Sequence, residues 1–287
     1  MNKSGVVDVF GGFGNQIFQF CFANSLKNKN LSITINTRDF DRVARENSPL
    51  LTARKLVLPL EYFEFDEITN EEFRSYKLKK LIYENKFTKK LINQNIYKSF
   101  NDKNYSPSEF KKFNRFTGNW QSLNLLNENK DFIKTSLSKN NILKDAIGSE
   151  VSSKKTLLHV RRNDYIKFNE ELNIEYYEKA LSVMKKKVKN FEYTVFTDDI
   201  DWVKKQKIFN DAILIHTSSD EPLDVINTFS LMLNNYHFIL ANSTFSMLAS
   251  FISQKTDSII ISPYPWFKKS NKDELINNKW NLIEVSN

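Results

Sequence analysis

The stretch Thr156-Leu157-Leu158-His159-Val160-Arg161-Arg162-Asn163-Asp164-Tyr165 joins an apolar run to a cluster of charged and polar side chains. Residues 156–160 are apolar and β-leaning, which predicts a buried strand of a parallel sheet. Ligands of open α/β sheets bind at the carboxyl ends of the strands, where the two arginines stand. Arginine keeps its charge near neutral pH, and its planar donor fork matches phosphate oxygens. The pattern predicts an anion site; the alternatives are a surface Arg–Asp ion pair and a packed strand histidine.

The composition bounds the class of protein. The chain has 287 residues, of which 40% are hydrophobic, so it can bury a full core, and its length favours two domains. No apolar run approaches the roughly 20 residues of a membrane span, and residues 1–10 lack a signal-peptide core. A single cysteine, Cys21, excludes an internal disulfide, and three histidines disfavour an imidazole metal site. The sequence predicts a cytoplasmic protein with no metal and no cofactor.

The net charge of +8 suits a polyanion, an anionic membrane surface or a phosphate-bearing small molecule as partner. The lysines are scattered, with clusters at residues 77–80, 89–90 and 185–187. Solvated helix faces are the plainer explanation for most of them. The charge therefore does not by itself select a function.

A glycine turn follows the first predicted strand, residues 5–10. Gly11-Gly12-Phe13-Gly14-Asn15-Gln16 leads into an amphipathic run, and this order of strand, turn and helix lets backbone N–H groups approach a phosphate or sugar. The turn is not a Walker loop, and it lacks the third glycine of the dinucleotide fingerprint. A turn without a ligand role is the alternative, but the amide pair Asn15-Gln16 at the mouth of the helix favours a site.

The second half of the chain alternates between predicted strands and helices. Strands are expected at residues 193–196, 212–215, 238–241 and 259–261, with helices at 175–188, at 222–233 and after residue 246. Asp198 and Asp199 follow one strand, and one of them is expected to cap the next helix. Asn242, Ser243, Thr244 and Ser246 follow another, which is more polar groups than one helix cap needs. Parallel βαβ units are the predicted architecture.

The first half is less regular. Residues 42–112 are basic, aromatic and interrupted by prolines, and Asp39-Phe40-Asp41 is rejected as a metal motif because it lies away from the strand end. Residues 115–122 predict a strand and a sharp turn that presents Trp120 and Gln121. A tryptophan beside an amide suits stacking on a sugar ring, although a core tryptophan fits the spacing equally well. Residues 124–148 look helical, and residues 148–153 look like a link between domains 1–150 and 151–287.

Four strand-end motifs, in this order, resemble the bacterial α-1,2-fucosyltransferase family. They are Gly12-Phe13-Gly14-Asn15-Gln16, His159-Val160-Arg161-Arg162-Asn163-Asp164-Tyr165, Phe196-Thr197-Asp198-Asp199 and Ala241-Asn242-Ser243-Thr244-Phe245-Ser246. Gly118-Asn119-Trp120-Gln121-Ser122 is similar to a further turn of that family. The resemblance covers nearly the whole chain except residues 42–113. The chain departs from the family's pattern at Thr228, where an acidic residue is usual. Asp224, one turn earlier, is a candidate replacement.

The resemblance implies an α/β fold of two Rossmann-like domains facing a cleft (GT-B-like), the second a parallel sheet with helices on both faces. Residues 1–150 would form the acceptor side and residues 151–287 would bind GDP-fucose. The implied reaction is metal-independent, inverting transfer of L-fucose to the 2-hydroxyl of a terminal galactoside in O-antigen or other surface polysaccharide. The acceptor is expected to be free or lipid-linked, with at most peripheral contact with the inner face of the membrane.

By motif position, Arg161 would hold the donor β-phosphate and Asn15 would reach the donor from the first domain. The other implied donor-binding residues are Gly12, Gly14, Gln16, His159, Arg162, Asp198, Asp199, Asn242, Ser243, Thr244 and Ser246. Trp120 and Gln121 are the expected acceptor contacts. Asp164 is expected to be catalytic together with Arg161 and Asn15. Asp164 and Asp199 are both candidates for the base that deprotonates the acceptor hydroxyl. The alternative is that they only orient the arginines or cap a helix.

Two other functions stay open at this point. One is a transferase that uses another nucleotide sugar or makes another fucosyl linkage. The other is a basic nucleic-acid-binding protein, since residues 97–116 mix basic and aromatic side chains, but no known module is present.

Overall fold

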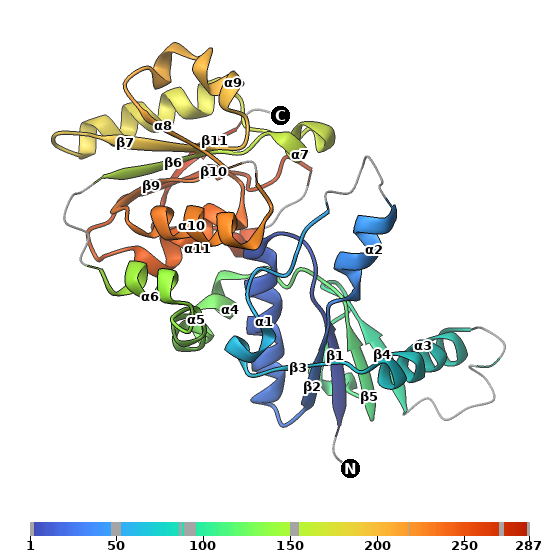
Figure 1. Cartoon of the computed structure of the whole chain (residues 1–287). Helices are drawn as coiled ribbons and strands as arrows, with labels where there is room; N and C mark the ends of the chain where they lie inside the picture. Colours follow the sequence, from blue (N-terminus) through green and yellow to red (C-terminus); the bar gives the residue numbers. More distant parts are fainter. Residues whose placement is uncertain are drawn as a thin grey trace. The chain divides into compact units, whose positions relative to one another are not determined.

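The computed structural model describes residues 3–46, 53–85, 88, 96–149, 155–217, 219–269 and 273–285 (Figure 1). The chain forms two compact units: one holds residues 1–121 and 125–133, the other residues 122–124 and 134–287. The chain thus changes unit between residues 122 and 134, earlier than the predicted boundary after residue 150. The predicted link at residues 148–153 falls largely outside the described residues.

The first unit is built on a parallel sheet of five strands in the order β3-β2-β1-β5-β4. Its strands are β1 (Ser4–Asp8), β2 (Ser32–Asn36), β3 (Asp66–Glu67), β4 (Tyr97–Phe100) and β5 (Phe113–Phe116). From β1 the chain fills one side of the sheet with β2 and β3 before it crosses to β4 and β5 on the other. The direction of winding therefore changes between β1 and β5, whose carboxyl ends precede the glycine turn and the Trp120 turn.

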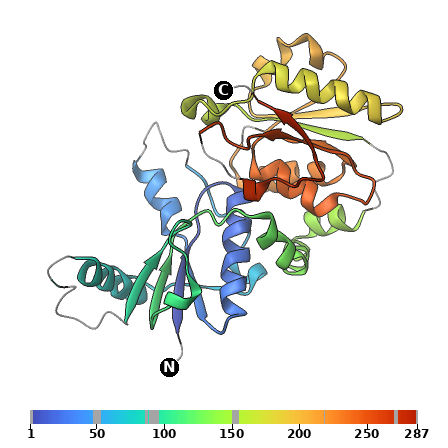
Figure 2. The same ribbon diagram turned by 180° about the vertical axis from the view of Figure 1, so that it is seen from behind.

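Helices cover this sheet on both faces (Figure 2). Its helical segments are α1 (Phe13–Lys27), α2 (Arg38–Glu46), η1 (Leu60–Phe63), α3 (Asn70–Glu84) and η3 (Pro107–Glu109), while α4 (Leu123–Glu128) and α5 (Lys130–Leu137) span the changes of unit. α1 is buried along most of its length, with Phe22 stacked on Trp120 at 3.8 Å between ring centroids. On the opposite face Val6, Tyr97 and Tyr76 of α3 form a smaller core.

The second unit carries a parallel sheet of six strands in the order β11-β10-β9-β6-β7-β8. The strands are β6 (Thr156–Val160), β7 (Tyr193–Thr197), β8 (Ile213–His216), β9 (His237–Ile239), β10 (Ile260–Tyr264) and β11 (Asn281–Glu284). Numbered within the unit, this is the order 3-2-1-4-5-6 reversed, the Rossmann arrangement. The direction of winding changes between β6 and β9. The predicted α/β class, with two parallel sheets, is confirmed.

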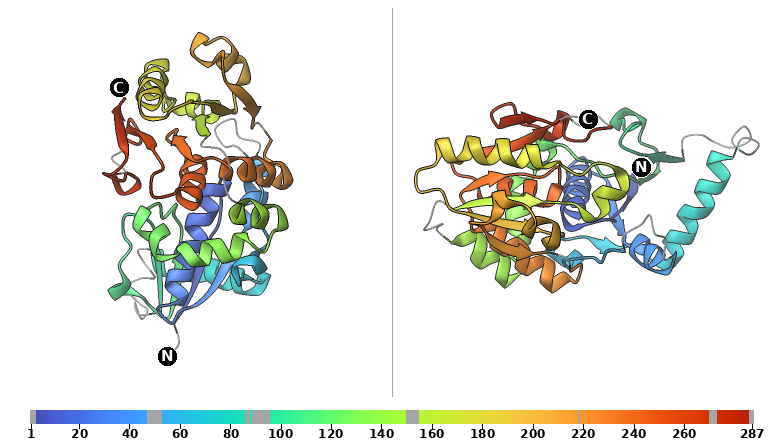
Figure 3. Two further views of the ribbon diagram at one scale, coloured as in Figure 1. Left: turned by 90° about the vertical axis from the view of Figure 1, so that its left-hand side faces the viewer. Right: turned by 90° about the horizontal axis from the view of Figure 1, so that it is seen from above.

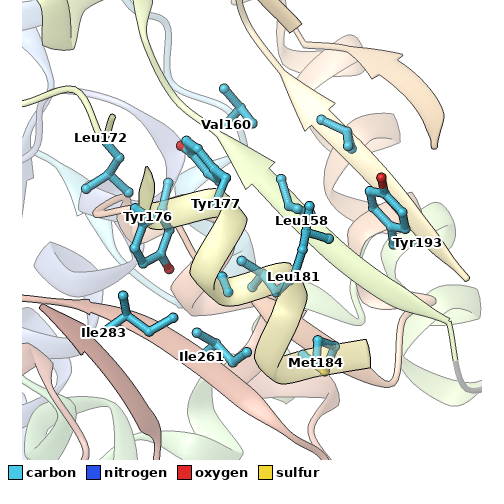
Figure 4. Packing of buried hydrophobic residues seen from close by; sticks show 14 of the residues in the cluster. Leu158, Val160, Leu172, Tyr176, Tyr177, Leu181, Met184, Tyr193, Ile261 and Ile283 are labelled. Atoms are coloured by element: carbon cyan, nitrogen blue, oxygen red, sulfur yellow. The ribbon is translucent and has the colours of Figure 1, made fainter. Parts of the chain in front are cut away.

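Successive side chains of β6 face opposite sides of the sheet and pack against different helices. Leu158 and Val160 face α8 (Ile174–Lys187), whose Tyr177, Leu181 and Met184 complete the larger core (Figure 4). His159 faces the other side, where α11 (Thr244–Ser253) and α10 (Pro222–Leu233) lie, and α6 (Asn141–Gly148) packs on α10. The remaining segments are α7 (Asn163–Phe168), α9 (Ile200–Lys204), η4 (Lys207–Phe209) and η5 (Asp273–Leu275). Helices on both faces of the sheet agree with the prediction.

The secondary structure differs from the predictions at a few places. Helix α3 lies in the stretch for which no regular structure was predicted, and β11 adds an edge strand after the one expected to close the series. The single helical region expected at residues 124–148 is three short helices. Asp199 caps α9 as expected, accepting a hydrogen bond from the backbone N–H of Trp202 at 3.0 Å.

Candidate functional site

The carboxyl ends of β6 and β9 lie side by side at the point where the second sheet changes its direction of winding. β6 pairs with β9 on one side and with β7 on the other, so the residues after all three strands meet at one edge. Open α/β sheets bind ligands in the crevice at such a point. The three motifs predicted from the second half of the chain are thereby brought together.

His159 connects β6 to α11. Its Nδ1 lies 2.9 Å from the hydroxyl oxygen of Ser246, and both side chains are buried. Burial, helped by the positive charge of Arg161, lowers the pKa of the imidazole to about 3. His159 is therefore neutral near pH 7 and acts as a hydrogen-bonding group.

Arg161 is held by two carboxylates. Its Nη2 lies 2.7 Å from an oxygen of Asp164, and its Nη1 lies 3.1 Å from an oxygen of Asp198. Burial works against its charge, but Asp198 and Asp164 raise the pKa of the guanidinium above its usual value, so the charge is permanent. The ring of Tyr165 also packs 5.6 Å from the guanidinium carbon. The fork is thus fixed in place at the end of β6.

The two carboxylates differ in exposure. The Asp198 side chain is 2% exposed and also accepts a hydrogen bond from the backbone N–H of Arg162 at 2.8 Å, whereas Asp164 is 22% exposed. Burial raises the pKa of Asp198, while Arg161 and the N–H of Arg162 oppose the shift. An anion that binds Arg161 has to share the guanidinium with Asp164, the more accessible of its two partners.

Arg162 points to different partners. Its Nε lies 3.1 Å from an oxygen of Asp199, and its guanidinium carbon lies 4.1 Å from the ring centre of Trp202. Asp199 both caps α9 and binds Arg162, which is the orienting role that the sequence left as an alternative. The pair stabilises the start of α9.

The start of α11 supplies hydrogen-bond donors and acceptors at the same edge. Ser243 caps the helix and accepts a 3.4 Å hydrogen bond from the N–H of Phe245, and Tyr165 donates to the carbonyl of Asn242 at 2.9 Å. The Asn242 amide donates to the carbonyl of Glu170 at 2.7 Å, while its buried Oδ1 has no hydrogen-bond partner among the described residues. A helix N-terminus favours negative charge.

The glycine motif of the first unit forms the predicted turn. Gly11 has φ of +78°, a left-handed conformation that favours glycine, and Gly12 caps α1. The Oδ1 of Asn15 accepts a 2.8 Å hydrogen bond from the side-chain amide of Gln121. This contact joins the turns after β1 and β5 and fixes the Asn15 oxygen toward Gln121, with the NH₂ group beside Gly11.

Gln16 and Gln19 hold the backbone around this turn. The Gln16 amide donates to the carbonyls of Gly11 at 2.9 Å and Lys55 at 2.8 Å, and its oxygen accepts from the N–H of Val57 at 3.1 Å. Gln19 accepts from the N–H of Phe10 and donates to the carbonyl of Gly118. The Gln16 amide is buried and bonded to three backbone groups, so in this structure it holds the turn.

Trp120 belongs to the core of the first unit. It stacks on Phe22 in parallel and is 8% exposed, and Asp102 holds its turn by accepting the backbone N–H of Trp120 at 2.8 Å. A side chain at Gly118 would collide with the same carboxylate. The core alternative therefore describes Trp120, and one face of its ring is closed to a sugar.

A charged cluster that the sequence analysis missed lies at the carboxyl end of β1. Asp8 accepts hydrogen bonds from Arg115 at 3.0 and 3.2 Å, from the Asn36 amide at 2.7 Å and from the Thr117 hydroxyl. The four residues come from three strands and one turn, up to 109 positions apart in the chain. The cluster ties the ends of β1, β2 and β5 together.

The described ranges contain neither a group of side chains suited to a metal ion nor a helix suited to span a membrane. No group of three or more His, Cys, Asp or Glu side chains there has a geometry that could hold a metal ion. No helix in this part of the chain has both the length and the apolar character needed to cross a bilayer. Asp224 is exposed and bonded to Ser219 at 2.6 Å, so its suggested replacement of an acidic residue at Thr228 stays a prediction.

The family model described as "Glycosyl transferase family 11" matches residues 6–284, almost the whole chain. The chain belongs to this family. The membership confirms the resemblance seen in the motifs and identifies the protein as a glycosyltransferase, which decides against a nucleic-acid-binding module.

Curated relatives of this family 11 chain come from Escherichia coli. An "Alpha-1,2-colitosyltransferase" is 27% identical and is covered to 98%, with 97% of this chain. The "O-antigen biosynthesis glycosyltransferase WbnK" is 26% identical and is covered to 97%, with 94% of this chain. Similar solved structures include the NodZ α-1,6-fucosyltransferase with GDP (12% identity, TM-score 0.43, 88% of this chain and 93% of that one). A mutant of Arabidopsis thaliana FUT1 with GDP has 11% identity and a TM-score of 0.49, over 88% of this chain and 69% of that one.

Proposed function

We propose that this family 11 enzyme transfers L-fucose from GDP-β-L-fucose to the 2-hydroxyl of a terminal galactoside. The product is an α-1,2 linkage formed with inversion and without a metal ion, in the synthesis of O-antigen or another surface polysaccharide. The observation that carries the proposal is the fixed guanidinium of Arg161 at the winding reversal of the second sheet, beside the start of α11. This is the position where an α/β sheet receives a nucleotide.

The chemistry asks for what these residues offer. As the sugar leaves, negative charge grows on the diphosphate, and fixed donors in a site that excludes water stabilise that charge most. Arg161 supplies a permanent positive charge, and the backbone N–H groups at the start of α11 supply dipoles aimed at an anion. Asn15 of the first unit contributes amide N–H donors to the same donor molecule in this proposal.

The contacts of the acidic residues bear on the general base. Asp164 is bonded to Arg161, and Asp199 binds Arg162 and caps α9. These contacts suit a carboxylate that orients an arginine better than one that accepts a proton from the acceptor hydroxyl. We therefore assign Asp164 and Asp199 to positioning, and no base to the acceptor hydroxyl.

The sugar and the acceptor draw support from the relatives. The name of one E. coli relative gives an α-1,2 linkage and that of the other gives O-antigen biosynthesis. Because the first is named for colitosyl transfer, GDP-linked colitose is the competing donor for this chain. A terminal β-galactoside, free or lipid-linked, is the acceptor implied by the family resemblance. The enzyme would meet a lipid-linked acceptor at the inner face of the membrane.

A donor panel tests the proposal. The purified chain is incubated with GDP-fucose, GDP-colitose, GDP-mannose and UDP-galactose, with and without a β-galactoside. The release of the nucleoside diphosphate, GDP or UDP, is measured. We expect GDP-fucose to turn over fastest, with a product whose NMR spectrum shows an α linkage to the 2-position. Preference for GDP-colitose would correct the sugar alone, whereas failure of every GDP-sugar would overturn the proposal.

A further inference from the structure

The outward face of α3 carries two leucines that have no place in a core. Leu78 is 57% exposed, and Leu81, at 70%, is the most exposed large hydrophobic side chain of the described residues. They are three positions apart on one helix and therefore share a face. A solvated helix normally carries polar side chains there, so this face has an unusual apolar content.

The inward face holds α3 to the sheet. Tyr76 packs against Tyr97 and Phe113, and the ammonium of Lys79 lies 4.2 Å from the ring centre of Phe113. A capping box between Thr69 and Glu72 closes the start of the helix. The fold of α3 therefore does not depend on Leu78 and Leu81, and its position at the outer edge of the first unit is visible in Figures 1 and 3.

Basic side chains flank the two leucines. Arg74, Lys77 and Lys80 are exposed and line the same hollow as Leu78 and Leu81, with Glu84, 4.0 Å from Lys80, at its end. Glu71 and Glu72 stand in the first turn of the helix. Lysine and arginine can keep their charged ends in water while their methylene stems lie along an apolar surface. Cations around a small apolar stripe are the pattern of a helix that lies in the interface of an anionic membrane.

Helix α10 also exposes two leucines, but without the basic side chains that accompany those of α3. Leu223 and Leu231 on α10 are 60% and 47% exposed, but the charged residues of that helix and its cap, Asp224 and Glu221, are both acidic, whereas α3 also carries one arginine and three lysines. An anionic surface repels such a helix. The pair on α10 therefore serves as a matched control.

We propose that the outward face of α3 docks on an anionic lipid bilayer. Leu78 and Leu81 enter the headgroup region, and Arg74, Lys77 and Lys80 bind the lipid phosphates. The inference does not rest on the donor or on the proposed reaction, since neither is needed for docking. It gives the chain a surface by which to reach an acceptor held in a membrane.

Vesicle flotation of the full chain tests this surface. We expect the wild type to float with phosphatidylcholine–phosphatidylglycerol vesicles at low salt, and to bind pure phosphatidylcholine and high-salt samples weakly. The double variants Leu78→Glu/Leu81→Glu and Lys77→Glu/Lys80→Glu should each lower the partition coefficient at least about tenfold. Both should keep the thermal midpoint and the rate of donor hydrolysis in solution, which separates this test from that of the proposed function.

Two controls match these changes. Leu223→Glu/Leu231→Glu places the same substitutions on α10, and Lys186→Glu/Lys187→Glu makes the same change of net charge on the exposed end of α8. Both should float like the wild type. The proposal is overturned if the wild type does not bind anionic vesicles, or if control and α3 variants lose binding equally. It is also overturned if the α3 leucines instead hold two copies together, which sedimentation without lipid would show.

Discussion

Arg161 is the residue on which the proposed chemistry depends most. Replacing it by alanine removes donors that bind more strongly as the leaving diphosphate gains charge. We expect a loss on the order of 3–4 kcal/mol in transition-state stabilisation, hence a fall in turnover of roughly a hundredfold or more. Arg161→Lys should recover little, because lysine keeps the charge without the planar fork that bridges Asp164 and Asp198. Turnover and GDP binding by calorimetry measure both effects.

A surface ion pair provides the control for Arg161. Arg42 lies 2.7 Å from Asp39 with half of its side chain exposed, so Arg42→Ala removes a similar pair away from the winding reversal. Its turnover should match the wild type. Normal turnover and unchanged GDP affinity in Arg161→Ala would remove the centre of the proposal.

Asn15 allows an isosteric substitution. Asn15→Asp keeps an oxygen that can accept from Gln121, but it loses the NH₂ donors and gains a negative charge near an anionic donor. Turnover should fall about a hundredfold or more by analogy with the loss of one oxyanion donor, with a thermal midpoint close to the wild type. If the variant unfolds early while its specific activity is normal, the glycine turn is only structural.

Gln121 should act through Asn15. Gln121→Ala removes the bond that fixes the amide, so we expect a smaller loss of turnover than in Asn15→Asp. Gln121→Glu can no longer donate to the Asn15 oxygen and should behave like the alanine variant. In a double-mutant cycle the two losses should not add, because one residue works through the other. Additive losses would separate Gln121 from Asn15.

Short sequence motifs were sufficient to find the residues at the strand ends, because the polar groups that follow a strand are its neighbours in the chain. The Asp8–Arg115 pair was not found for the opposite reason. Its partners are 107 positions apart and meet only through the pairing of β1 with β5. Likewise, spacing could not decide between a sugar-binding and a core Trp120, since the answer lies in its stacking on Phe22.

At the scale of elements, the bond from His159 on β6 to Ser246 on α11 couples stability to pH. The pKa of His159 is about 3 in the folded chain and about 6.5 in an unfolded one, so the unfolded state binds more protons between these values. The contribution of neutral His159 to the free energy of unfolding is therefore complete above about pH 6.5. It is lost as the pH falls toward 3, by at most about 1.4 kcal/mol per pH unit. In His159→Asn the free energy of unfolding should fall less steeply over this range, as measured by urea titration at several pH values. An unchanged slope in His159→Asn would mean that the imidazole already takes up a proton in the folded chain.

Periodicity predicted most elements of the second unit, because its central strands β6, β7 and β9 are buried on both faces and its helices have one apolar stripe. It failed for α3, where Leu78 and Leu81 on the outer face mix with the inward Tyr76 and hide the helical period. It also failed for β11, a four-residue edge strand with one buried side chain, Ile283. Elements that depend on tertiary neighbours carry a weak local signal.

In each of the two units, the predicted site residues stand where the parallel sheet reverses its direction of winding. Each sheet reverses its winding once, between β1 and β5 in the first unit and between β6 and β9 in the second. Asn15 and Gln121 stand at the first reversal, and Arg161 and Asn242 stand at the second. The second unit begins before residue 150 because α6, which precedes the central strand in the chain, packs on α10 of that unit. The cleft between the units stays a prediction.

The whole reaction should proceed without a metal ion. A diphosphate leaving group requires either a cation or fixed donors. This chain offers the guanidinium of Arg161 and the start of α11, and its described residues hold no cluster of three or more metal-binding side chains. Turnover of GDP-fucose should therefore stay within about twofold of the untreated enzyme in excess EDTA, by analogy with transferases that stabilise charge with fixed donors. Adding Mn²⁺ or Mg²⁺ to the dialysed enzyme should likewise change little. A loss of most turnover with chelator, restored by either ion but not by Ca²⁺, would show that the leaving group is stabilised by a metal that Arg161 does not replace.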